Sequence, residues 1–115
     1  MNNRTGKLRI VLLPSLEREI RRIDDKKQLE LILKAKEKLE RMGEKAMKIL
    51  YSRGNYKLGE IKYKKPPYRL YIIYDQEDTT FYLVSWAHKK YQDKVLQKMK
   101  KDLKDILIYG IEHLL

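Results

Sequence analysis

The spacing of the apolar residues changes near residue 58, and this change restricts the possible folds more than any other feature. Before it, apolar residues such as Leu29, Ile32 and Leu33 recur at intervals of three and four, which is typical of a helix with one buried stripe. After it, apolar and polar residues alternate, which is typical of strands with one buried face. The chain is therefore expected to be an α+β protein.

The predicted elements run in the order strand, two helices, three strands, helix. Residues 7–13 form the first strand, residues 15–23 and 25–42 form two antiparallel helices joined by a tight turn, and residues 44–57 form a connector in which 48–51 are partly structured. Ser15 is expected to cap the first helix and Asp25 the second, and Gly43 to end the second.

The second half of the chain is predicted to form a three-stranded antiparallel meander followed by a long helix. The strands span residues 58–64, 68–75 and 79–87, and Pro66 and Pro67 separate the first two because prolines are excluded from a central strand. The last helix runs from about residue 91 to Gly110. Residues 106–115 form an apolar tail, which requires a partner surface in the protein's own core or on another chain.

A length of 115 residues suits one compact domain, residues 1–115. The absence of cysteine excludes disulfides and thiolate metal sites, no pair of histidines has metal-ligand spacing, and the five glycines are scattered. We therefore expect no cofactor and no metal. The polar first nine residues, and the lack of an apolar run of about 20 residues, predict a soluble, cytoplasmic protein without a signal peptide.

The charge balance points to a negatively charged partner. The chain has 27 Lys and Arg residues against 16 Asp and Glu residues, a net charge of +11. Such an excess favours nucleic acid, an acidic protein or an anionic membrane. The alternative is a lysine-rich proteome, for example that of a thermophile, although thermophile charge is usually closer to balanced.

Alternation gathers charged and aromatic side chains on one side of two neighbouring predicted strands. Glu60, Lys62 and Lys64 share one side of the first strand, and Arg69 and Tyr71 share one side of the next. If the hairpin places both sets on the same side, one patch holds a carboxylate, two amines, a guanidinium and a phenol. This patch is expected on the open face of the sheet.

The chemistry of this patch suits RNA, while the opposite side, with Ile61, Leu70 and Ile72, is expected to pack under the helices. Lysine and arginine bind phosphates and release counterions, and tyrosines stack on the unstacked bases of single-stranded RNA. The alternative is that these exposed lysines and tyrosines provide only solubility, strand propensity and protection of the sheet edge.

A second cluster lies where the last strand meets the last helix. His88 is one of two histidines and is able to exchange a proton near neutral pH, and Lys89 and Lys90 are able to stabilise phosphate charge. The alternative for His88 is a solvated loop or capping residue. Trp86 is expected in the core, and His113, in the apolar tail, is treated as structural.

Three stretches together resemble the RelE/ParE superfamily, especially its HigB-like and phage Gp49-like branches. They are residues 57–62 (KLGEIK), residues 68–74 (YRLYIIY) and residues 81–90 (FYLVSWAHKK). The order of the predicted elements is also similar, and the resemblance covers about residues 7–100. It implies a RelE-like fold and a toxin of a type II toxin–antitoxin system.

Members of the RelE and HigB type are ribosome-dependent mRNA endonucleases, so the resemblance implies cleavage without metal. In that reaction the ribose 2′-hydroxyl attacks the adjacent phosphate and leaves a 2′,3′-cyclic phosphate and a 5′-hydroxyl. The implied partners are mRNA bound on the ribosome and a cognate antitoxin with an acidic segment. The implied assembly is a homodimer or a toxin–antitoxin hetero-oligomer.

The resemblance also implies roles for individual residues. Arg69 matches the phosphate-stabilising arginine and Lys62 a strand lysine, while Lys89 falls near a catalytic arginine or lysine. Glu60 and His88 are the implied proton-transfer groups. The remaining residues expected to contact RNA are Lys64, Lys65, Tyr71, Lys90 and Tyr91.

The chain departs from the resemblance at its C-terminus. Many relatives place a catalytic histidine or tyrosine there, whereas this chain continues through a long helix and an apolar tail. A competing hypothesis is a non-catalytic protein of the same fold, either a gyrase-poisoning toxin or a nucleic-acid-binding module. The feature that separates the two hypotheses is whether Glu60, Arg69 and His88 converge on one phosphate-sized site.

Overall fold

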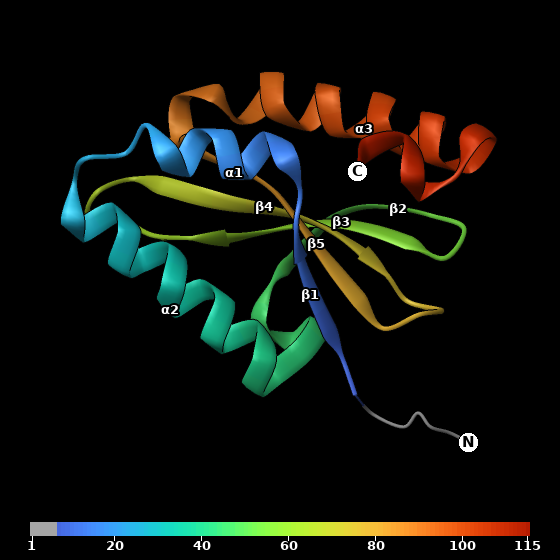
Figure 1. Ribbon diagram of the computed structural model, residues 1–115, viewed down its shortest axis with the longest axis horizontal. Coiled ribbons are helices and arrows are strands. Elements are labelled where there is room, and N and C mark those ends of the chain that lie inside the picture. Colours follow the sequence, from blue (N-terminus) through green and yellow to red (C-terminus); the bar gives the residue numbers. More distant parts are fainter. Residues whose placement is uncertain (1–6) are drawn as a thin grey trace.

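The computed structural model describes residues 7–115 and contains a five-stranded mixed sheet with helices on both faces (Figure 1). The strands are β1 (Arg9–Leu12), β2 (Lys48–Arg53), β3 (Tyr56–Lys62), β4 (Tyr68–Asp75) and β5 (Thr80–His88). Their order in the sheet is β1-β5-β4-β3-β2, with β1 parallel to β5 and all other neighbours antiparallel. Residues 1–6, which entered the prediction that no signal peptide is present, lie outside the described residues.

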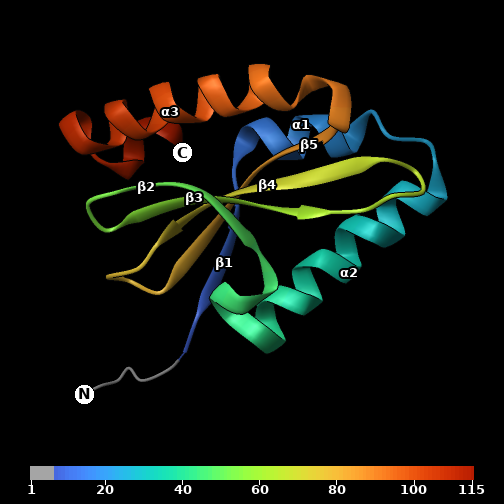
Figure 2. The ribbon, with the colours of Figure 1, turned by 180° about the vertical axis from the view of Figure 1, so that it is seen from behind.

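The helices form two layers around the sheet. They are α1 (Pro14–Arg21), α2 (Lys26–Met42) and α3 (Gln92–Tyr109), with short 3-10 turns η1 (Gly43–Ala46), η2 (Lys89–Tyr91) and η3 (Ile111–Leu114). Both ribbon views place α2 on one side of the sheet and α3 on the other (Figures 1 and 2). The predicted α+β class is confirmed, but α1 lies along β5 instead of pairing with α2 as an antiparallel hairpin.

The predicted helix cap at Asp25 and the predicted helix ends at Gly43 and Gly110 are correct. The Asp25 side chain accepts a hydrogen bond from the backbone nitrogen of Lys27 at 2.9 Å, and Gly43 ends α2 with a φ of +59°. The prediction that Ser15 caps α1 is wrong. Leu13 occupies the cap position, Pro14 begins the helix, and the Ser15 hydroxyl instead donates to the Val84 carbonyl at 2.8 Å.

The sequence analysis missed β2, so the predicted three-stranded meander is a four-stranded one. This edge strand is exposed at both ends, and its register with β3 shifts between Ile49 and Tyr51, which breaks the alternation that marks a strand. The close approach of β2 to β3 depends on Gly59. A Cβ atom at this position would lie 2.8 Å from the Met47 sulfur and 2.9 Å from the Lys48 carbonyl oxygen.

Each face of the sheet carries its own hydrophobic core. Ile61, Leu70 and Ile72 pack with residues of α1 and α2, as predicted. The other face is not open, which corrects the sequence prediction. Met99, Leu103 and Ile106 of α3 are buried against it, because α3 presents an apolar stripe to the sheet.

The C-terminal tail folds back beneath α3 (Figure 1). Ile111 and Leu114 pack against the core on the α3 side. Of the two partner surfaces predicted for the tail, this part of it therefore uses the protein's own core. Ile108, Tyr109 and Leu115 remain exposed. None of the helices formed by residues 7–115 is long and apolar enough to cross a membrane.

Candidate active site

A pocket of about 510 Å³ lies at the end of the β3–β4 hairpin, next to η2. We call it the cationic pocket. It is lined by Lys62, Tyr63, Lys64, Pro67, Arg69 and Lys89. Four of these six residues carry a positive charge, and no carboxylate among residues 7–115 lines the pocket. Such a site attracts a phosphate group.

The strand register explains how the cations meet. Lys62 on β3 lies directly opposite Arg69 on β4, so their side chains leave the same face of the sheet. Lys64 follows just after the end of β3. Lys89 is brought to the same place by a hydrogen bond from its backbone nitrogen to the Pro67 carbonyl at 2.9 Å. The structure therefore brings together four of the cations that the sequence analysis predicted at this site.

Arg69 is held from below by Glu60. Its Nη1 atom lies 3.3 Å from the Glu60 Oε1 atom, and the Glu60 side chain is 1% exposed against 17% for Arg69. A carboxylate this deeply buried requires a charged partner, and Arg69 supplies it. The structure thus joins Glu60 and Arg69 as predicted, but it places Glu60 beneath the pocket and not in its lining.

Tyr71 lies beside this pair and is fully buried under α3. Its hydroxyl makes no hydrogen bond with any of the described residues. Burial raises the pKa of Tyr71, nearby Glu60 raises it further, and the Arg69 guanidinium opposes the shift. The prediction that Tyr71 stacks on a base is wrong for this arrangement, because α3 covers the face on which its ring lies.

Tyr63 lines the cationic pocket and also packs against the core that contains Ile61, with its ring 6.1 Å from the ring of Trp86. The sequence analysis did not name it as a site residue, and β3 ends one residue before it, at Lys62. The signal that identifies Tyr63 is its place just before Pro66 and Pro67, where a strand has to stop. Burial raises the pKa of Tyr63, so its phenol stays protonated at neutral pH.

His88 does not line the cationic pocket. Its ring packs edge-on against Tyr68 with centroids 5.5 Å apart, and its Nδ1 atom accepts a hydrogen bond from the backbone nitrogen of Lys90 at 3.1 Å. This is the capping arrangement that the sequence analysis gave as the alternative. Trp86 is 5% exposed, which confirms its predicted place in the core.

The remaining predicted RNA contacts are exposed. Lys65 lies in the loop that follows β3, and Lys90 and Tyr91 lie in η2. The Lys90 ammonium is 5.2 Å from the centre of the Tyr91 ring. Tyr91 is 47% exposed but faces away from the cationic pocket, towards a second pocket beyond η2. Within residues 7–115, no group of three or more His, Asp or Glu side chains forms a candidate metal site.

Comparisons with known proteins bear on the fold. No family model matches the sequence, and no curated protein matches it. A chain in the crystal structure of the archaeal RelE–RelB complex from Pyrococcus horikoshii OT3 is similar, with a TM-score of 0.56 and 14% sequence identity over 71% of this chain and 94% of that chain. The narrower likeness to HigB-like and phage Gp49-like proteins stays a prediction. The described part of the chain has a RelE-like fold.

Proposed function

We propose that the cationic pocket binds the phosphate backbone of mRNA, and that the protein is the toxin of a type II toxin–antitoxin pair that cleaves the RNA there. The observation that carries this proposal is the meeting of Lys62, Lys64, Arg69 and Lys89 around one pocket without a lining carboxylate. The RelE-like fold supports it. A pocket of this charge favours the phosphate most strongly when negative charge builds up on it, which is what catalysis of phosphate transfer requires.

The proposed reaction needs no metal. The ribose 2′-hydroxyl loses its proton to water and its oxygen forms a bond to the adjacent phosphorus, while the bond from phosphorus to the 5′-oxygen breaks and that oxygen takes up a proton. The products are a 2′,3′-cyclic phosphate and a 5′-hydroxyl. Arg69 offers two parallel N–H groups to the phosphate, and the pocket lysines neutralise its oxygens. Glu60 keeps the guanidinium in place through the 3.3 Å contact.

Proton transfer is assigned to groups that line the pocket. His88 lies outside it and Glu60 lies beneath it, so both are less suited to this role than the sequence analysis expected. The protonated phenol of Tyr63 and the ammonium groups of the lining lysines are placed to give a proton to the departing 5′-oxygen. In this proposal Glu60 is a positioning residue for Arg69.

The second part of the proposal is a protein partner. The similar archaeal chain comes from a RelE–RelB complex, which supports a cognate antitoxin for this protein too. A net charge of +11 favours an acidic segment in that partner, because complementary charge speeds association and excludes wrong partners. We propose that such a segment competes with RNA for the cationic face.

A second candidate function is RNA binding without cleavage. The position of His88 favours it, because the three residues predicted to converge on one site do not all do so. In that case the cationic pocket is a phosphate-binding site only. A single experiment in cells separates the two candidates.

The test is to induce the protein and to map new 5′-hydroxyl RNA ends. We expect new ends with the wild type and with Arg53→Ala, an exposed arginine on β2. Arg69→Ala and Lys89→Ala should lower the cleavage rate by about 10²–10³, as removal of a transition-state donor does. Lys89 is exposed, so its substitution leaves the fold intact even if Arg69→Ala does not. Growth arrest without new ends would exclude cleavage and favour the binding function.

A further inference from the structure

A second pocket, of about 420 Å³, lies on the other side of η2 between α1, β5 and α3. We call it the α1–α3 pocket. Its polar lining residues are Ser15, Glu19, Ser85, Tyr91, Lys94 and Lys98, and its apolar ones are Val84, Ala87, Val95 and Met99. The short η2 segment separates the two pockets, because Lys89 lines the cationic pocket and Tyr91 lines this one.

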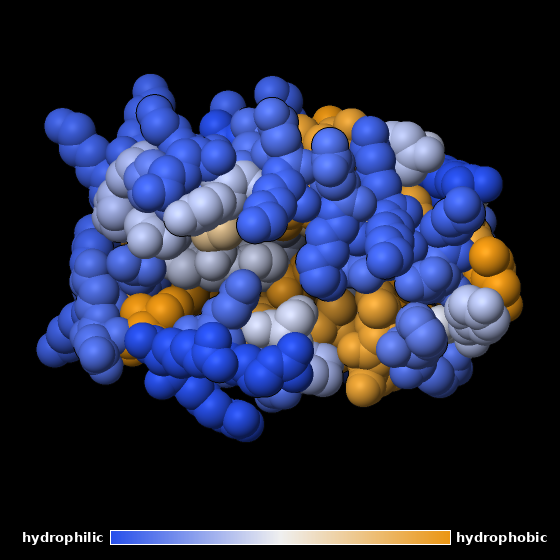
Figure 3. All heavy atoms as spheres, turned by 90° about the horizontal axis from the view of Figure 1, so that it is seen from above, coloured by the Kyte–Doolittle hydropathy of each residue, from blue (hydrophilic) through white to orange (hydrophobic). Residues whose placement is uncertain are grey.

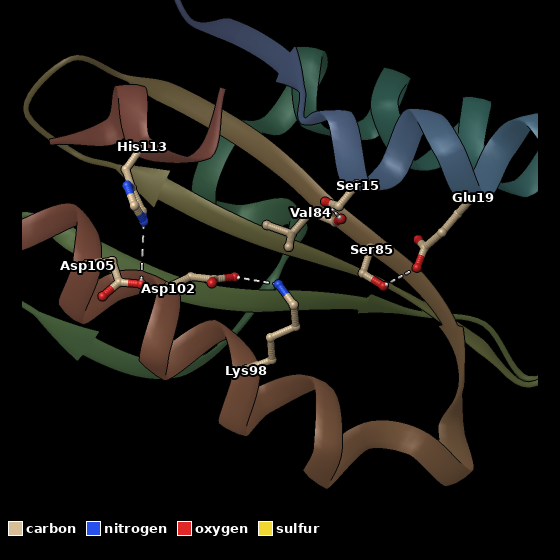
Figure 4. Close-up of polar contacts among 8 residues, drawn as sticks. All are labelled: Ser15, Glu19, Val84, Ser85, Lys98, Asp102, Asp105 and His113. Atoms are coloured by element: carbon tan, nitrogen blue, oxygen red, sulfur yellow. Dashed lines mark hydrogen bonds and ion pairs between the residues drawn. The ribbon is translucent and has the colours of Figure 1, made fainter. Parts of the chain in front are cut away.

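Hydrogen-bond acceptors dominate one wall of the α1–α3 pocket (Figure 4). The Ser15 hydroxyl donates to the Val84 carbonyl at 2.8 Å, and the Ser85 hydroxyl donates to the Glu19 carboxylate at 3.1 Å. The other Glu19 oxygen accepts from the backbone nitrogen of Trp86 at 2.9 Å. Since both hydroxyl hydrogens are used within the protein, the wall has only acceptor lone pairs left for a ligand.

Glu19 is fixed in place but its charge is not neutralised. It forms no ion pair with a cation among residues 7–115, although it lies in the pocket lining with Lys94 and Lys98. A ligand that presents N–H groups to this carboxylate therefore gains strong, charge-assisted hydrogen bonds.

The rest of the pocket lining consists of apolar side chains and two lysines. Tyr91 is an exposed aromatic ring beside the apolar floor, which is what an unstacked base requires. Lys98 is paired with Asp102 at 3.1 Å, whereas Lys94 forms no ion pair with another described residue. Lys94 is therefore free to contact a phosphate. Viewed from the α3 side, hydrophilic side chains cover most of this surface, with apolar atoms between them (Figure 3).

We propose that the α1–α3 pocket binds one base of the RNA strand whose phosphate lies in the cationic pocket, and that it selects bases with an amino group. Adenine, cytosine and guanine present N–H₂ donors to Glu19, whereas uracil offers only its N3–H, which lies between two carbonyl oxygens that the acceptor wall repels. The volume lies within the range of small-ligand sites. This inference rests on the proposed function.

A segment of an acidic partner protein is the other possible occupant. It fits less well, because its carboxylates would face the unneutralised charge of Glu19. The position of the cationic pocket on the other side of the short η2 segment also favours a nucleotide chain. The experiment below therefore tests RNA oligomers and an acidic polypeptide as ligands.

The test measures binding of labelled single-stranded oligomers of about six nucleotides by fluorescence anisotropy. Oligo(A) and oligo(C) should bind about ten times more tightly than oligo(U). Tyr91→Ala should weaken binding of oligo(A) about tenfold and Tyr91→Phe should not, because stacking needs only the ring. The matched control is Tyr109→Ala, which removes an exposed tyrosine at the far end of α3.

The preference for amino-bearing bases is tested separately. Glu19→Gln replaces one acceptor by a donor and should reduce the preference for oligo(A) over oligo(U) to near unity. Glu17→Gln, on the exposed side of the same helix, should leave it unchanged. Circular dichroism of each variant verifies that α1 remains folded.

Several outcomes would overturn the inference. Binding that depends on Lys89 but shows no base preference and no effect of Tyr91→Ala would leave the proposed function standing and remove the base pocket. If no binding of single-stranded RNA depends on Lys89, both the proposed function and the base pocket are contradicted. AMP binding as tight as oligo(A) and insensitive to Lys89→Ala would indicate a site for free nucleotides. If Tyr91→Ala weakens the binding of poly-glutamate but not the binding of RNA, the pocket is a site for a protein partner.

Discussion

At the scale of single residues, Arg69 connects the cationic pocket to the interior of the protein. Its side chain is mostly buried, lines the pocket and contacts the almost fully buried Glu60. Removing one partner of such a pair leaves the other charge buried without compensation. The same contact therefore stabilises the fold and aims the guanidinium at the pocket.

This contact leads to a prediction for Glu60→Gln. The substitution keeps the size of the side chain but removes the charge, so the free energy of unfolding should fall by roughly 2 kcal/mol. Urea denaturation measures it. The matched control is Glu40→Gln, which breaks the exposed pair with Lys36 and should cost less than about 0.5 kcal/mol. Equal losses in the two variants would contradict the account of a buried, supporting ion pair.

Alternation predicted the residues within the strands better than those just beyond them. Lys62 and Arg69 share a face because both lie inside regular, paired strands. Tyr63 was missed as a residue of the pocket lining because β3 ends before it, and alternation carries no information outside a strand. His88 was misplaced because neighbours in sequence do not reveal that its ring packs on Tyr68.

At the scale of elements, helix α3 determines whether the face of the sheet opposite α2 is exposed to solvent or buried. Its apolar stripe was visible in the sequence, but the face of the sheet that it covers was not, because packing between distant elements leaves no local pattern. As a result the sequence analysis placed Tyr71 on an open face that is buried. Strand β2 was missed for a related reason, since an exposed, bulged edge strand lacks regular alternation.

The packing of α3 leads to a prediction for two leucines on the same helix. Leu103 is fully buried against the sheet, whereas Leu107 is 44% exposed. Leu103→Ala should lower the free energy of unfolding by about 3 kcal/mol because it leaves a cavity in the core. Leu107→Ala should have a much smaller effect. Thermal and urea unfolding of both variants measure the two losses. A larger loss of unfolding free energy in Leu107→Ala than in Leu103→Ala would contradict this packing.

At the scale of the whole molecule, a net charge of +11 alone would give some affinity for any polyanion. The structure concentrates four of these positive charges around the cationic pocket. The cationic pocket and the α1–α3 pocket lie on either side of η2. Helix α2, which carries several exposed lysines, covers the face of the sheet opposite α3. We therefore expect the affinity for RNA to depend more on where a lysine lies than on the total charge of the protein.

The most direct test of that claim is the salt dependence of binding to single-stranded RNA. The slope of log affinity against log salt should become shallower by about 0.7 for each phosphate-contacting lysine removed. We expect this change in the triple variant Lys62→Ala, Lys64→Ala, Lys89→Ala. The control of equal charge is Lys26→Ala, Lys27→Ala, Lys34→Ala, all exposed on α2. An unchanged slope in the control would support the cationic pocket as the RNA site, and an equal change in both variants would contradict it.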